Sequence, residues 1–273
     1  MFEEILNHLQ ENKPIVHCIT NFVTVNDCAN IVLAGGGSPT MAHDIEEVEE
    51  ITEMSQSLML NMGTLGNDLD AMILAGKKAN ELGHPVVLDP VAVGASKLRT
   101  DAYHRLENAV RLSVIRGNIS EIKAIATGTG STKGVDADQL DAVTEDTLDE
   151  VIAKVKELSH KTGAVIAVSG AIDLVADDKK AYVIRNGHPM MARITGTGCM
   201  LTALIGAFCG ANPECILDAT AAAVCAMGLC GELAYEKTVR TDGGTLSFHT
   251  YLIDYISNLT TERLNGGIKL EVR

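Results

Sequence analysis

Short β-rich runs alternate with helical patterns along the first two thirds of the chain, and this alternation limits the possible folds more than any other feature. The runs are bounded by turn residues and lie at residues 15–20, 57–62, 85–89, 113–116 and 164–169. Apolar residues recur at helical spacing over 25–34, 45–54, 99–112 and 144–160. Asp44 can cap the second of these helices, and Asp68 lies in the first turn of a further one. The alternation predicts an α/β fold with a mostly parallel central sheet and helices on both faces.

The last third of the chain predicts a hairpin followed by helices. Residues 173–176 and 181–185 are joined by a short polar turn, so we expect an antiparallel hairpin toward one edge of a mixed sheet. Three apolar helical patterns follow Gly196. The second is rich in alanine, which predicts a buried helix. We expect Asn212 to cap this helix and Pro213 to lie in its first turn. Because no linker or repeat divides the sequence, we expect a single domain over residues 1–273 with a helical C-terminal part.

The charge of the chain argues against nucleic-acid and membrane partners. With 22 basic and 36 acidic residues, the formal net charge is −14, and basic residues never occur in runs longer than two. Phosphate backbones and anionic lipids are therefore disfavoured as partners. The first 14 residues are acidic and amphipathic, unlike a signal peptide. The longest uncharged stretch, 194–213, contains four glycines and three threonines, which favours a buried helix over a membrane span.

The seven cysteines predict free thiols in a cytoplasmic protein. Their number is odd, they form no CxxC pair, and no export signal precedes them. We expect most of them to be small core residues. His17 and Cys18 are adjacent, but nothing near them repeats the spacing of zinc ligands, so a structural metal site is not expected.

Three glycine-rich segments could bind phosphate, and they differ in value. Residues 35–37 follow a helical pattern and are most simply a helix end. Residues 128–134 resemble a P-loop, but Lys133 precedes the final glycine instead of following it, so a polar solvent loop is favoured. Residues 194–201 place two glycines directly before a long apolar helix, whose first N–H groups and dipole can bind an anion. Cys199 would lie in that first turn, where the dipole lowers the pKa of a thiol; a glycine turn before a core helix with an incidental cysteine is equally compatible.

Six segments together resemble the hydroxyethylthiazole kinase family. They are HCITNFVTVNDCAN (17–30), SPTMAHDIEEVEE (38–50), VVLDPVAVGAS (86–96), VIRGNISEI (114–122), VSGAIDLV (168–175) and TGTGCMLTALIGAF (195–208). The resemblance implies a ribokinase-like fold and the phosphorylation of 4-methyl-5-(2-hydroxyethyl)thiazole by ATP and Mg²⁺ in thiamine salvage. It also implies a homotrimer with active sites between subunits.

The resemblance assigns roles to single residues. It implies a thiazole site with Met41, Gly196 and, more weakly, Asn21. It implies an ATP site with Arg116 and Ser169, where the family commonly has threonine in place of the serine. It also implies that Asp89 and Glu121 organise Mg²⁺, directly or through water.

The chemistry of the residues is compatible with these roles. Phosphoryl transfer depends mostly on positioning and charge neutralisation, which suits Arg116, Mg²⁺ and an anion hole formed by Gly196, Thr197, Gly198 and Cys199. Carboxylates are the hard ligands that Mg²⁺ prefers, and a thioether is a soft contact for a thiazole ring. Taken singly, these same residues are more often turn acids, a surface charge or core positions.

Cys199 occupies a position where many kinases of the broader fold resemble one another in having an aspartate base. A thiolate cannot fully deprotonate an alcohol in the ground state, but it can accept the proton late, as charge leaves the nucleophile. We therefore expect direct in-line transfer, with Cys199 as an orienting group and weak base, rather than a phosphocysteine intermediate.

Three alternative functions stay open at this level. The first is a related kinase that acts on a hydroxymethylpyrimidine or a sugar. The second is a nucleotide-dependent dehydratase for hydrated nicotinamide cofactors, which shares the general architecture. The third is a regulator that binds a thiazole or a nucleotide without turnover.

Overall fold

The strands of the chain form one nine-stranded sheet in a computed structural model that describes residues 2–66, 68–128 and 143–273. In the described residues the strand order is β2-β1-β3-β4-β5-β6-β7-β8-β9. The bounds are β1 (Ile15–Ile19), β2 (Ser38–Thr40), β3 (Ser57–Asn61), β4 (Val86–Asp89), β5 (Val114–Asn118), β6 (Val165–Ser169), β7 (Asp173–Ala176), β8 (Ala181–Ile184) and β9 (Leu270–Val272). Pairing is parallel from β2 to β6 and antiparallel from β6 to β9.

This sheet confirms the predicted mixed α/β architecture, including the hairpin β7–β8. The hairpin lies toward one edge, and β9 forms the edge itself. Neither β2 nor β9 was predicted. The strand β2 has only three residues, one of them a proline, and gives no signal. The strand β9 does lie in a run, residues 268–273, in which apolar and charged side chains alternate, so its signal was present and was missed. Of the glycine-rich segment 128–134, all but Gly128 lies outside the described residues.

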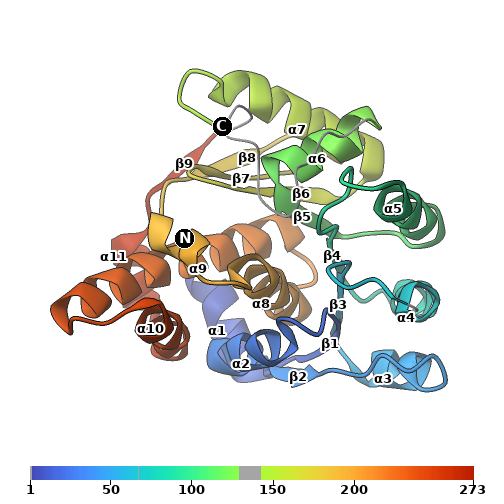
Figure 1. Ribbon diagram of the computed structural model, residues 1–273, viewed down its shortest axis with the longest axis horizontal. Coiled ribbons are helices and arrows are strands. Elements are labelled where there is room, and N and C mark those ends of the chain that lie inside the picture. Colours follow the sequence, from blue (N-terminus) through green and yellow to red (C-terminus); the bar gives the residue numbers. More distant parts are fainter. Residues whose placement is uncertain (1, 67, 129–142) are drawn as a thin grey trace.

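Helices cover both faces of the sheet (Figure 1). Their bounds are α1 (Glu3–Asn12), α2 (Val25–Gly35), α3 (Val48–Met54), α4 (Asp68–Leu82), α5 (Lys97–Ala109), α6 (Ile119–Thr127), α7 (Leu148–Thr162), η2 (Pro189–Arg193), α8 (Thr197–Ala211), α9 (Ile216–Arg240), α10 (Thr245–Ser257) and α11 (Thr261–Gly267). Alternate residues of β3 enter opposite cores: Met59 packs with α1, α2 and α8 to α11, whereas Leu58 and Leu60 pack with α4 to α7. The strict alternation follows from the two-residue period of a strand covered on both sides.

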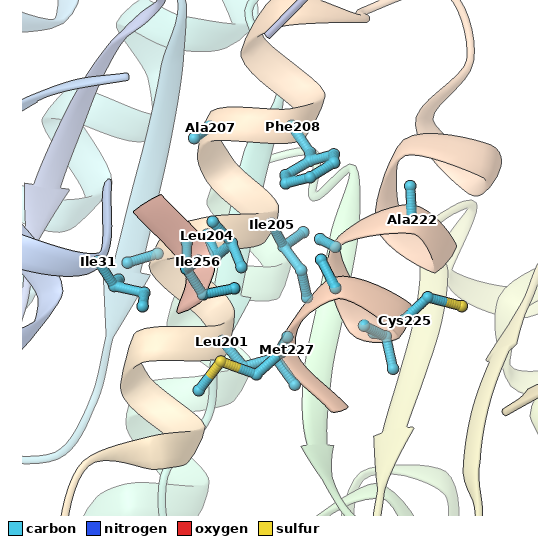
Figure 2. Close-up of a cluster of buried hydrophobic side chains, with 14 of the residues drawn as sticks. Ile31, Leu201, Leu204, Ile205, Ala207, Phe208, Ala222, Cys225, Met227 and Ile256 are labelled. Carbon is cyan, nitrogen blue, oxygen red and sulfur yellow. The ribbon is translucent and has the colours of Figure 1, made fainter. Parts of the chain in front are cut away.

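Helix α8 is the central helix of the first of these cores. Its side chains Leu201, Leu204, Ile205 and Phe208 pack against α2, α9 and α10 (Figure 2). This burial confirms that the uncharged stretch 194–213 is mostly a core helix. Helix α9 is long and apolar enough to cross a membrane by length and composition, but 72% of its most apolar window is buried inside the molecule.

Two predicted helix starts are wrong by about three residues. Asp44 accepts a hydrogen bond from the Glu46 amide (2.9 Å), which makes a side-chain turn, and α3 begins only at Val48. Asn212 ends α8 rather than capping α9, because its amide donates to the carbonyls of Ile5 (3.1 Å) and Phe208 (3.0 Å). Helix α9 therefore starts at Ile216, after Pro213 and not around it.

Candidate active site

A cavity of about 1040 Å³ opens at the carboxyl ends of the parallel strands. Asp89 and Ser169, the last residues of β4 and β6, line it together with the N-terminus of α8. This edge is where open α/β sheets bind ligands. The cavity brings together nearly all of the predicted site residues: Asn21, Asp89, Arg116, Glu121, Ser169, Gly196, Thr197, Gly198 and Cys199.

Met41 is the exception, because it does not line the cavity. It follows the edge strand β2 and is partly buried against the core that contains α8. Its predicted contact with a thiazole therefore stays a prediction, because the lining of the cavity in a single chain does not include it.

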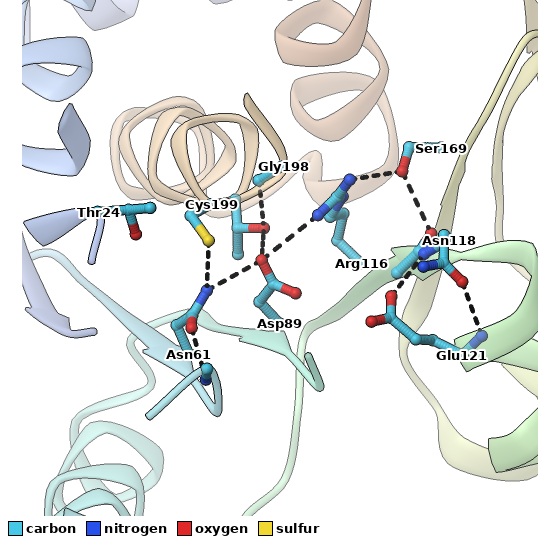
Figure 3. Close-up of polar contacts among 12 residues, drawn as sticks. Thr24, Asn61, Asp89, Arg116, Asn118, Glu121, Ser169, Gly198 and Cys199 are labelled. Carbon is cyan, nitrogen blue, oxygen red and sulfur yellow. Dashed lines mark hydrogen bonds and ion pairs between the residues drawn. The ribbon is translucent and has the colours of Figure 1, made fainter. Parts of the chain in front are cut away.

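The N-terminus of α8 and Arg116 together form a strongly electropositive corner. Gly196 caps the helix with φ 87°, a conformation that glycine adopts without strain. Gly198 has no side chain, and a Cβ there would lie 2.5 Å from Nη1 of Arg116, so the guanidinium lies directly against the first turn (Figure 3). Nε of Arg116 is buried and has no hydrogen-bond partner in the described part of the chain. A guanidinium and the positive end of a helix dipole at the same place favour a bound anion.

Arg116 is held by two neighbours. Its Nη2 donates to Oγ of Ser169 (2.5 Å), and its Nη1 lies 3.4 Å from Oδ2 of Asp89. Asp89 is 1% exposed, and its Oδ2 also accepts hydrogen bonds from Oγ1 of Thr202 (2.9 Å) and Nδ2 of Asn61 (3.1 Å). Burial raises the pKa of Asp89, whereas Arg116 opposes that rise. All three donors act on Oδ2, so Oδ1 is the oxygen left for a ligand.

Glu121 is oriented by a capping box at the start of α6. Its Oε2 accepts from the Asn118 amide (2.8 Å), while the Asn118 side chain accepts from the Glu121 amide (2.9 Å). Oε1 accepts from the Ala92 amide (2.8 Å). Burial, followed by the negative charge of Asp89, raises the pKa of Glu121 to about 7. The charge of Asp89 thus disfavours the ionisation of Glu121, and a bound divalent cation would relieve this.

Cys199 lies in the first turn of α8, as predicted, but its pKa shifts in the opposite direction. Its sulfur accepts hydrogen bonds from Nδ2 of Asn61 (3.2 Å) and Nδ2 of Asn21 (3.4 Å). Burial and the charge of Asp89 raise the pKa of the thiol. The expected lowering by the helix dipole is therefore wrong in its net direction, because desolvation of a thiolate outweighs it. The other six cysteines are also free, and five of them are buried, which confirms their expected role in the core.

Sequence reasoning missed Asn61 and Thr202 as site residues. Asn61 is the last residue of β3, and Thr202 lies one helical turn after Gly198. A polar residue at the end of a buried strand was the available signal for Asn61. Thr202 had none, because a threonine inside an apolar helix is usually explained by a hydrogen bond to its own backbone, and Thr202 does make one to Gly198 (3.1 Å).

Asp173 gives a pH-dependent stability that can be measured. It begins β7 on the cavity wall, accepts a hydrogen bond from the Gly170 amide (2.8 Å), and burial raises its pKa to about 7. Between pH 4 and 7 the folded chain therefore holds a proton that the unfolded chain has lost, so stability falls as the pH rises, by at most about 1.4 kcal/mol per pH unit. Asp173→Asn keeps the acceptor oxygen and should remove this part of the pH dependence.

Urea unfolding of both proteins at pH 5 and pH 8 measures the effect. The variant should lose less stability than the parent protein between the two pH values. An identical loss in the two proteins would show that Asp173 titrates normally.

Comparisons with known proteins match nearly the whole chain to one family. The family model described as the hydroxyethylthiazole kinase family matches residues 6–262. A hydroxyethylthiazole kinase from Clostridium acetobutylicum is 55% identical over 272 residues, covering 99% of each chain. One from Desulfovibrio desulfuricans is 48% identical over 267 residues, covering 95% of this chain and 94% of the relative.

Solved structures agree with the fold. The structure of a hydroxyethylthiazole kinase from Pyrococcus horikoshii is similar with a TM-score of 0.87 and 35% identity, over 99% of this chain and 98% of that one. A ribokinase-like superfamily protein from Enterococcus faecalis has a TM-score of 0.62 at 13% identity, over 93% of this chain and 94% of that one. The latter likeness concerns the fold alone, and it agrees with the predicted ribokinase-like architecture.

Proposed function

Because the chain belongs to the hydroxyethylthiazole kinase family, we propose that it transfers the γ-phosphoryl group of ATP to the hydroxyl of 4-methyl-5-(2-hydroxyethyl)thiazole, in thiamine salvage. The observation that carries the proposal is the guanidinium of Arg116 against the N-terminus of α8, inside a cavity large enough for both substrates. Both groups attract the phosphoryl oxygens and stabilise the charge that develops on them during in-line transfer.

ATP binds on the side of the cavity that contains Arg116 and Ser169. The side chain of Arg116 is held by Ser169, so less conformational freedom is lost when a phosphate binds. The amide groups of Thr197, Gly198 and Cys199 form the anion hole for the transferred phosphoryl group, since the first N–H groups of a helix have no partner within it.

Mg²⁺ fits the two carboxylates on this side of the cavity. The negative charge of Asp89 raises the pKa of Glu121, so a cation near the two carboxylates is favourable. In the described residues no group of three or more histidine, cysteine or acidic side chains is arranged around one metal position. This suits Mg²⁺, which keeps several waters and takes one or two carboxylates plus substrate phosphates. When bound, the ion supplies positive charge that neutralises the phosphates; Asp89 and Glu121 would hold it directly or through water.

The thiazole alcohol binds next to Cys199. Asn21 and Gly196 line this part of the cavity, and we propose both as substrate contacts. The substrate hydroxyl donates a hydrogen bond to Sγ of Cys199. Because the pKa of Cys199 is raised, the form that can accept a proton is its minor thiolate form. As the new P–O bond forms and the bond to ADP breaks, the proton of the hydroxyl moves to this thiolate and gives the neutral thiol. A covalent phosphocysteine is not needed, because the hydroxyl attacks ATP directly.

We propose a homotrimer with active sites at the subunit interfaces. Phe22 is 79% exposed next to Val23, which lines the cavity, so a large apolar side chain lies at the cavity's mouth. An interface would cover this side chain. Met41, which lies outside the cavity of its own chain, is proposed as a thiazole contact of such a shared site. Analytical ultracentrifugation should give about three times the chain's 29.0 kDa.

The free thiols support a cytoplasmic location. All seven cysteines are unpaired, five of them buried, which fits a reducing compartment.

A coupled assay of ADP release tests the proposed reaction. The protein is offered Mg²⁺, ATP and the thiazole alcohol, beside hydroxymethylpyrimidine, a sugar and a control without acceptor. Release of ADP that depends on the thiazole alcohol supports the proposal. Release with another acceptor would favour a related kinase, whereas folded protein that releases none would favour a dehydratase or a binding protein.

A further inference from the structure

The sulfur of Cys199 is held between two amide side chains. Nδ2 of Asn61 donates to it at 3.2 Å and Nδ2 of Asn21 at 3.4 Å (Figure 3 draws the former). The two asparagines come from different parts of the chain: Asn61 ends β3, and Asn21 lies between β1 and α2. Sulfur is a weak acceptor, so two amide donors on one thiol are an arrangement that needs an explanation.

The hydrogen bonds of the two amides fix which atom faces the sulfur. Oδ1 of Asn61 accepts from Nδ2 of Asn21 (2.9 Å) and from the Gly63 amide (2.8 Å), so its Nδ2 must point to Cys199. Oδ1 of Asn21 accepts from the amides of Val23 (3.1 Å) and Thr24 (3.1 Å), which fixes its Nδ2 in the same way. If the amide of Asn61 were turned over, its NH₂ group would face the N–H donors of Asn21 and Gly63. If the amide of Asn21 were turned over, its oxygen would face the oxygen of Asn61, and its NH₂ group would face two backbone N–H donors.

Both asparagines are also prevented from moving. Asn61 is 1% exposed and Asn21 is 4% exposed. A Cβ at Gly63 would lie 2.8 Å from Nδ2 of Asn21, so the backbone packs directly against this side chain. Buried networks in which every member is satisfied are rigid.

Asn61 contacts a second group of the site with the same nitrogen. Its Nδ2 also donates to Oδ2 of Asp89 (3.1 Å). One amide therefore connects the sulfur on the substrate side of the cavity to the carboxylate on the magnesium side. The relative position of the two depends on this single side chain.

We propose that Asn61 is a positioning residue for phosphoryl transfer, whose amide holds Sγ of Cys199 as the acceptor for the substrate hydroxyl. The inference rests on the function proposed above. Asn61 acts through Cys199, so its contribution exists only while the sulfur is present. Misplacing a reacting group by about 1 Å costs up to about 10²-fold in rate.

The experiment is a double-mutant cycle between Asn61→Ala and Cys199→Ala. We expect Asn61→Ala to lower kcat by about 10- to 100-fold, with the KM for ATP nearly unchanged. In the Cys199→Ala background the same substitution should change kcat by less than about threefold, because its target is gone. Equal losses in both backgrounds would overturn the proposal, since Asn61 would then act through Asp89 or through the fold.

Asn212→Ala is the matched structural control. Asn212 is buried like Asn61 and its side chain makes three hydrogen bonds, but it lies at the far end of α8, away from the cavity. It should lower the thermal stability while kcat stays that of the parent protein. A fall in kcat equal to that of Asn61→Ala would identify the effect of Asn61 as general destabilisation.

A second measurement does not depend on the proposed reaction. Alkylation of Cys199 by iodoacetamide is followed by mass spectrometry in a Cys215→Ser background, because Cys215 is the exposed cysteine. The thiolate is the form that reacts with iodoacetamide, and the amide of Asn61 donates a hydrogen bond that stabilises it. Asn61→Ala should therefore slow the alkylation of Cys199 at a fixed pH by at least threefold. An unchanged or faster rate would overturn the proposal. Slower alkylation in a protein without thiazole kinase activity would support the effect of Asn61 on the sulfur and reject the proposed function.

Discussion

Replacing Arg116 by methionine should lower kcat/KM for ATP by about 10³-fold, the low end of the range for arginines that stabilise phosphoryl transfer. The guanidinium lies against the first turn of α8, where Gly198 leaves room for it. Its loss removes charge where the transferred group binds and leaves Asp89 buried without its cation. Steady-state kinetics with varied ATP measure the effect, and circular dichroism checks the fold.

Two control variants separate charge from geometry. Arg116→Lys keeps the charge but not the planar fork, so it should recover only part of the rate. Ser169→Ala removes one hydrogen bond from Arg116 and should cost less than about tenfold. If the folded Arg116→Met protein kept activity within fivefold of the parent, this corner would not be the phosphate site.

Replacing Cys199 by alanine should lower kcat by about 10²- to 10⁴-fold, the usual effect of an acid–base group, and leave a measurable rate. The remaining rate comes from the anion hole and Arg116, which the substitution does not touch. Cys199→Asp should stay active, because Asn21 and Asn61 can donate to a carboxylate as they do to the sulfur, and an acidic group suits the first turn of a helix. Single-turnover assays with the thiazole alcohol measure both variants.

Inactivity of both Cys199 variants in folded protein would contradict the role of a weak base. It would instead indicate that the sulfur reacts covalently. Phosphate found on Cys199 by mass spectrometry after incubation with ATP would establish that route.

Much of the architecture could be predicted because it depends on local patterns. Strand burial follows from β-rich runs such as residues 57–62, and the α8 start follows from two glycines before an apolar run. The N-terminus of α8, predicted from these glycines, and Arg116, singled out by the resemblance, line the same cavity. The short strand β2 could not be predicted, since its three residues carry no periodicity, whereas β9 lies in an alternating run, residues 268–273, that could have been recognised.

The site depends on contacts between residues that are far apart in the chain. Asn61 and Cys199 are separated by 138 positions, and Asp89 and Thr202 by 113. No local pattern encodes such pairs, so the two amide hydrogen bonds to the sulfur of Cys199 could not be predicted from the sequence.

The sequence by itself determined the alternation of strands and helices, the helix N-terminus at Gly196 and the residue types of a phosphoryl-transfer site. These depend on periodicity and on chemistry within a few residues. Only the tertiary structure decided that Met41 lies outside the cavity and that burial, not the helix dipole, sets the pKa of Cys199. Burial is decided by everything packed around a group, and that is known only when distant segments have come together.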